Sequence, residues 1–155
     1  MNSVLFVLLL VLIDQISKIA MKVISSVNSE SFTIIKNFFY ITYAENTGAA
    51  FSILKGQRWF FVVMALVVCG IITFYIIKYK PKPLEKFSLQ LIVAGAIGNV
   101  IDRLVYGYVI DFLDFYIFCY DFPVFNIADC CITIGAVLLI LSELIFGEKI
   151  KLWKK

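Results

Sequence analysis

The stretch from Trp59 to Ile77 contains no charged residue and is almost entirely apolar. A helix over this stretch would be about 28 Å long, close to the roughly 30 Å thickness of a bilayer's hydrocarbon core. A soluble domain of this size offers no comparable apolar surroundings for such a helix. The stretch therefore predicts a membrane span, and it constrains the fold more than any other feature of the chain.

Three further apolar stretches, at about 4–24, 87–106 and 127–146, have a suitable length for spans. The hydrophobic share of 62% is well above that of an ordinary soluble domain. The first stretch lacks the basic start and the small-residue cleavage site of a secretory signal, so we expect it to be retained. We expect an all-α polytopic membrane protein, with residues 1–155 forming a single domain.

The lysines indicate how the spans are oriented. Lys and Arg are absent from Leu104 through Glu148, whereas the turn at 78–86 and the C-terminal tail are rich in Lys. Because basic residues favour the cytoplasmic side, the turn and both termini should lie in the cytoplasm. The segments around 25–57 and 107–126 should then lie outside, which places Asp111 and Asp129 near the outer face of the membrane.

Two of these outer segments are rich in β-branched and aromatic residues, namely Phe32 to Tyr43 and Val109 to Phe118. Such composition favours extended structure, and Tyr and Phe suit the boundary between lipid and water. We therefore expect a small β-sheet platform on the outer surface of the membrane.

Several classes of chemistry are disfavoured by what the sequence lacks. With no His, serine–histidine and cysteine–histidine mechanisms are excluded. The four cysteines have no regular spacing, so we expect neither a zinc site nor any other metal or cofactor. Cys119 could pair with Cys130 or Cys131, a question that the sequence leaves open. The lysines are not clustered as on a nucleic-acid-binding surface, so we expect no nucleic-acid partner.

Asp111 and Asp129 are the candidate catalytic groups. Asp129 follows the motif FNIA at the start of the fourth span, where a carboxylate could simply compensate the helix dipole and Asn126 could cap the helix. Asp111 lies among apolar residues on the same side of the membrane. Two nearby carboxylates cannot both ionise cheaply, so the pair can hold one proton and perform acid–base chemistry on a bound water.

Other polar residues in the spans need partners, because ionisable groups in lipid are costly. Asp14 and Lys18 are one helical turn apart and should form a structural ion pair. Asn99 and Asp102 share a face of the third span, and Arg103 could neutralise a neighbour or meet an anionic group of a substrate. Glu143, near the inner end of the fourth span, is interpreted as a solvated carboxylate.

Five blocks in this order resemble those of the bacterial lipoprotein signal peptidase family, also called signal peptidase II: DQISK at 14–18, NTGAAF at 46–51, GAIGNVIDR at 95–103, VIDF at 109–112 and FNIAD at 125–129. The resemblance implies an aspartic endopeptidase that removes signal peptides from diacylglyceryl-modified prolipoproteins, cutting before the lipid-bearing cysteine. It assigns the catalytic pair to Asp111 and Asp129. It also implies that a set of polar residues lines or supports the site: Asn46, Asn99, Arg103 and Asn126.

Two other classes of function fit the sequence less well. A small ion-coupled transporter should place its acids near the midplane on discontinuous or repeated helices, and no repeat is visible. A scaffold held by ion pairs would leave Asp111 without a role. We therefore expect a plasma-membrane peptidase that acts on a lipidated prolipoprotein in contact with membrane lipid. The oligomeric state stays open, with a monomer as the simplest expectation.

Overall fold

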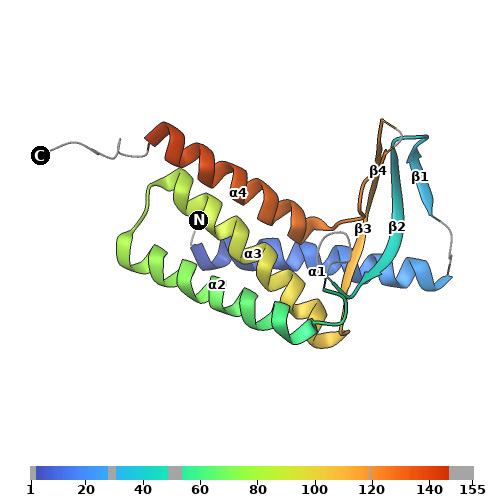
Figure 1. Ribbon diagram of the computed structural model, residues 1–155, viewed down its shortest axis with the longest axis horizontal. Helices are drawn as coiled ribbons and strands as arrows, with labels where there is room; N and C mark the ends of the chain where they lie inside the picture. The colour runs from blue at the N-terminus through green and yellow to red at the C-terminus, as the bar shows by residue number, and fades with distance from the viewer. Residues whose placement is uncertain (1–2, 28–30, 49–53, 119, 147–155) are drawn as a thin grey trace, which may run out of the picture.

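The computed structural model describes residues 3–27, 31–48, 54–118 and 120–146. Across these residues, four long helices lie side by side and a small sheet stands across one end of the bundle (Figure 1). The four helices are long and apolar enough to cross a membrane. This architecture confirms the predicted fold class.

The helices are α1 (Ser3–Val27), α2 (Arg58–Tyr79), α3 (Pro83–Val105) and α4 (Ile127–Phe146). Each overlaps one of the expected spans. The third helix begins before the expected position 87, because Pro83 starts it as the first helical residue, where a missing N–H is tolerated. The second helix ends at Tyr79, followed by Lys80 in the left-handed conformation and then by Pro81, so α2 and α3 run antiparallel.

The third helix is the centre of the bundle. It has the lowest mean hydropathy of the four, 1.4. In its most apolar 18-residue stretch 61% of the residues are buried inside the protein, against 6–22% for the other helices. The helices α1, α2 and α4 all pack on α3, while α2 and α4 lie on either side of it (Figure 1). Four polar residues of α3 are therefore enclosed by protein rather than exposed to lipid, namely Ser88, Gln90, Asn99 and Asp102.

Two glycines of α3 permit this close packing. A Cβ on Gly95 would collide with the carbonyl oxygen of Ala128 in α4. A Cβ on Gly98 would lie 2.5 Å from Oδ2 of Asp14 in α1. Only a residue without a side chain fits at either place, so the small residues bring α1 and the start of α4 directly against the middle of α3.

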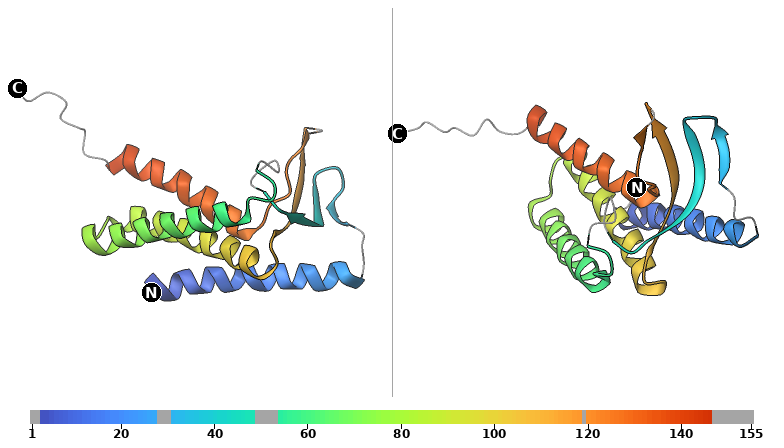
Figure 2. Two further views of the ribbon diagram at one scale, coloured as in Figure 1. Left: turned by 60° about the horizontal axis from the view of Figure 1, so that its bottom comes forward. Right: turned by 45° about the vertical axis from the view of Figure 1, so that its right-hand side comes forward.

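The sheet contains β1 (Phe32–Ile35), β2 (Phe39–Asn46), β3 (Val109–Ile117) and β4 (Tyr120–Asp121), all antiparallel and in that order. The central pair joins segments far apart in the sequence, with Ala44 opposite Asp111 and Asn46 opposite Val109. Its register shifts between Ile41 and Ala44. Figure 2 shows the strands crossing the end of the bundle at which α4 begins, which brings β3 next to the start of that helix.

Candidate active site

Asp111 and Asp129 line one hollow of about 510 Å³ at the junction of the sheet and the helices. Asp111 lies in β3 and is 2% exposed, while Asp129 lies in the first turn of α4. The polar lining also includes side chains predicted from the sequence, Asn46, Asn99 and Arg103. The tertiary structure thus brings together residues from three separate parts of the chain.

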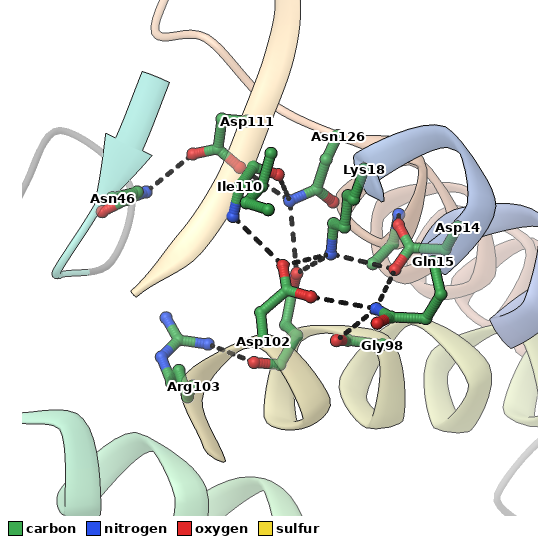
Figure 3. A network of polar contacts seen from close by, with 12 residues as sticks. Asp14, Gln15, Lys18, Asn46, Gly98, Asp102, Arg103, Ile110, Asp111 and Asn126 are labelled. Atoms are coloured by element: carbon green, nitrogen blue, oxygen red, sulfur yellow. Dashed lines mark hydrogen bonds and ion pairs between the residues drawn. The ribbon is translucent and has the colours of Figure 1, made fainter. Parts of the chain in front are cut away.

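Asn126 connects the two aspartates and is fully buried. Its side-chain amide donates a hydrogen bond to Oδ1 of Asp111 at 2.6 Å, as Figure 3 shows. Its Oδ1 accepts a hydrogen bond from the backbone N–H of Asp129 at 2.9 Å, and its own N–H donates to Oδ2 of Asp129 at 3.2 Å. These reciprocal bonds confirm that Asn126 caps α4 and orients Asp129.

Each carboxylate receives a further amide from a different element. Asn99 in α3 donates to Oδ1 of Asp129 at 2.8 Å. Asn46, at the end of β2, donates to Oδ2 of Asp111 at 3.0 Å, and its Oδ1 accepts the backbone N–H of Gly48 at 2.9 Å. Since both carboxyl groups are held from two directions, their orientation is fixed before any substrate arrives.

The protonation of Asp111 is shifted by its surroundings. Burial, and after it the charge of Asp129, raise its pKa from 3.8 to about 7, against the opposing effect of the amides of Asn46 and Asn126. Desolvation and a like charge both disfavour the ionised carboxylate, which explains the direction of the shift. Asp111 can therefore gain and lose a proton near neutral pH.

A second polar cluster lies beside the hollow, around Lys18. Its Nζ is 2.9 Å from Oδ2 of Asp14 and 3.0 Å from Oδ2 of Asp102, and it donates to Oδ1 of Asn99 at 2.9 Å (Figure 3). All three acidic or basic side chains are at most 2% exposed. The predicted ion pair between Asp14 and Lys18 is confirmed, and Asp102 is a second partner that sequence reasoning did not identify.

The cluster also fixes elements around the site. Asp14 accepts the N–H of Ala128 at 2.8 Å, and Asp102 accepts the N–H of Ile110 at 3.0 Å. These two backbone positions directly precede Asp129 and Asp111. Gln15, which sequence reasoning also missed, donates to Asp102 at 2.9 Å. The one available signal for Gln15 was its polar side chain within an apolar span.

Arg103 is not paired with Asp102, one of the alternatives that the sequence left open. Its Nη2 donates to the carbonyl of Gly48 at 2.9 Å, and its Nη1 donates to the carbonyl of Asn99 at 3.4 Å. The guanidinium lies 4.8 Å from the ring centroid of Phe61. Arg103 therefore links α3 to the loop that follows β2 while facing the hollow.

The remaining wall of the hollow is mainly apolar and comes from the segment 122–125 and from residues 132–134 of α4. Sequence reasoning did not identify these residues. Cys130 lines the same wall, and Cys130 and Cys131 are free thiols. Cys119, the other half of the disulfide that was left open, lies outside the described residues.

Comparisons with known proteins find relatives along most of the chain. The family model described as signal peptidase (SPase) II matches residues 6–145. The chain is 46% identical over 143 residues to the lipoprotein signal peptidase of Cupriavidus taiwanensis, covering 90% of this chain and 80% of that protein. It is 44% identical over 149 residues to the lipoprotein signal peptidase of Staphylococcus carnosus, covering 95% and 93%.

A solved structure is also similar along nearly the whole chain. It is a bacterial membrane enzyme determined by the in meso method at 2.3 Å resolution, with a TM-score of 0.83 and 35% sequence identity. The similarity covers 99% of this chain and 93% of the other. The arrangement of helices and sheet is therefore that of a solved bacterial membrane enzyme.

Proposed function

The chain belongs to the signal peptidase II family of aspartic peptidases, and we propose that Asp111 and Asp129 are its catalytic pair. Membership makes the protein a membrane peptidase that processes the signal peptides of lipoproteins. The observation that supports the assignment of the pair is the single hollow that both carboxyl groups line, with Asn126 bonded to each residue.

In the proposed mechanism the two carboxyl groups share one proton around a water molecule. Asp111, with a pKa of about 7, holds the proton and donates a hydrogen bond to the scissile carbonyl oxygen. Asp129, ionised and held by Asn99 and Asn126, takes a proton from the water as its oxygen attacks the carbonyl carbon. When the C–N bond breaks, the leaving nitrogen receives a proton from Asp129.

The proposed substrate is a diacylglyceryl-modified prolipoprotein cut just before its lipid-bearing cysteine. The apolar wall formed by residues 122–125 and 132–134 suits the apolar side chains near such a cleavage point. The lipid itself would remain in the bilayer. A monomer stays our expectation for the oligomeric state.

The proposed orientation places both termini and the 78–86 turn in the cytoplasm and the hollow near the outer face. Its support is the concentration of lysines at the turn and the tail, together with their absence from 104–148. A site near the outer surface would meet the cleavage point of a lipid-anchored precursor where it leaves the bilayer.

The assignment of the pair is tested by cleavage of a diacylglyceryl-modified precursor with purified variants in detergent. Asp111→Asn and Asp129→Asn should each lose nearly all activity, because an amide cannot accept the proton of the water. The double variant should be scarcely slower than either single one, since residues that act as a unit are non-additive.

Asp114→Asn is the matched control, because it makes the same change in the same strand. Asp114 is 7% exposed and accepts a hydrogen bond from Thr42, but it does not line the hollow. It should retain turnover. Substantial cleavage by either single variant of the pair, in protein that melts like the wild type, would show that the assignment is wrong.

A further inference from the structure

A second hollow lies between α2 and α4 at the end of the bundle away from the sheet. It has a volume of about 300 Å³, and α3 forms its floor. Its walls are apolar apart from three residues, Tyr75, Glu85 and Glu143. The helices α2 and α4 lie on either side of α3 (Figure 1), and residues of all three helices line this hollow.

The two hollows lie along the same faces of α3 and α4. Asp129 and Glu143 are 14 positions apart in α4, and Asn99 and Glu85 are 14 positions apart in α3. At about 100° per residue, each pair differs by roughly 40° around its helix, so the members share a face. At the sheet end Asn99 bonds to Asp129, and at the other end Glu85 and Glu143 line one hollow.

Positions 129 and 143 lie about 21 Å apart along the axis of α4, because each of the 14 residues that separate them adds about 1.5 Å, and positions 85 and 99 lie equally far apart in α3. A signal peptide has a basic region followed by an apolar region of about 7–15 residues and then the cleavage site. A mainly helical apolar region of 10–14 residues would span this distance, allowing for extended residues beside the scissile bond. When the cleavage point is at the aspartates, the basic region is therefore at Glu85 and Glu143.

The charges of this second hollow complement such a partner. No lysine or arginine lines it, and neither glutamate forms an ion pair with a described basic residue. Glu85 accepts a hydrogen bond from the hydroxyl of Tyr75 at 2.7 Å, which orients its carboxylate at the hollow. Glu143 is exposed, so its carboxylate is available to an incoming cation.

We propose that the faces of α3 and α4 that carry both hollows bind the signal segment of the substrate along its length, with Glu85 and Glu143 recognising its basic N-terminal region. This inference depends on the proposed function, since it requires the cleavage point to lie at Asp111 and Asp129. The distance between the two hollows then favours precursors whose positive charges lie 10–14 residues before the cleavage point.

The test compares three lipidated precursors that differ only before the cleavage point. One has two lysines about 12 residues upstream, the second has glutamines there, and the third has the lysines moved seven residues further away. The wild-type enzyme should prefer the first by about three- to tenfold in kcat/KM, mainly through KM, because partly exposed ion pairs are weak. Higher ionic strength should reduce this preference.

The Glu85→Gln/Glu143→Gln double variant should cleave the lysine and glutamine precursors at equal rates. Glutamine at position 85 can still accept the hydrogen bond from Tyr75, so the fold should be retained. Glu85→Lys/Glu143→Lys should instead prefer a precursor with two glutamates at the same place. Asp121→Asn, which removes an exposed carboxylate from the sheet, should keep the wild-type preference.

An undiminished lysine preference in the Gln double variant, or an equal preference for the precursor with displaced lysines, would overturn the inference while leaving the proposed function intact. Failure of the wild-type enzyme to cleave any of the three precursors would instead contradict the proposed function. Thermal melting of each variant separates a loss of recognition from a loss of fold.

Discussion

Replacing Lys18 by Met tests whether the cluster around it stabilises the fold. The three N–H groups of the ammonium are matched by three acceptors, the carboxylates of Asp14 and Asp102 and the amide oxygen of Asn99. Met has a similar length but no charge. The substitution therefore leaves two buried carboxylates, 2% and 0% exposed, without their shared cation.

The expected loss in the free energy of unfolding is limited by the least unfavourable response of the folded protein, which is to protonate one of the two carboxyl groups. An ordinary aspartic acid has a pKa of about 3.9, so protonation at pH 7 costs about 4 kcal/mol. This value agrees with the roughly 3–5 kcal/mol lost when a buried ion pair is broken. At pH 5 the same protonation requires only about 1.5 kcal/mol. The destabilisation should therefore shrink as the pH falls.

The assay is thermal unfolding in detergent, followed by circular dichroism at pH 7 and pH 5. At pH 7, Lys18→Met should lower Tm by roughly 10 °C, and at pH 5 by less than half as much. Adding Asp14→Asn should recover part of the loss, because it removes one unpaired charge. Lys36→Met, at an exposed lysine of the β1–β2 turn, is the control and should change little. An equal loss at both pH values would refute the reasoning.

Two further predictions concern protonation and orientation. Because the pKa of Asp111 is raised to about 7 in the fold, its contribution to stability is complete below about pH 4 and is lost as the pH rises through 7. The free energy of unfolding of the wild type should thus fall by roughly 3 kcal/mol more than that of Asp111→Asn between pH 5 and pH 8, measured by denaturant titration; parallel pH profiles would contradict this. Cysteines introduced into the 78–86 turn should resist membrane-impermeant thiol reagents in intact cells, and labelling from outside would reverse the proposed orientation.

Much of the fold was predictable because the relevant signals are local. The apolar stretch from Trp59 to Ile77 predicts a helix whatever its neighbours are, since lipid requires every backbone polar group to be paired within the segment. Pro81 and Pro83 indicate the break between α2 and α3 in the same local way. The β-branched and aromatic composition of 32–43 and 109–118 likewise predicted extended structure.

The candidate site was predictable in its members but not in its connections. Asp111 and Asp129 could be chosen because a carboxylate among apolar residues needs an explanation. That Asn126 would bond to both residues depends on how β3 approaches the first turn of α4. The strand register that places Asp111 opposite Ala44 also depends on a bulge in β2, which local composition does not specify.

The sequence by itself determined the number and approximate limits of the spans, the strand-forming segments and the shortlist of ionisable residues, because these depend on local transfer free energies and backbone preferences. Only the tertiary structure decided the partners. Asp102 rather than Arg103 is the second partner of α1, because the close approach at Gly98 brings one face of α3 against Asp14 and Lys18. Which residues become partners depends on the packing of helices that are distant in sequence. If one helix were rotated about its axis by one residue, about 100°, it would present a different side chain to its neighbour.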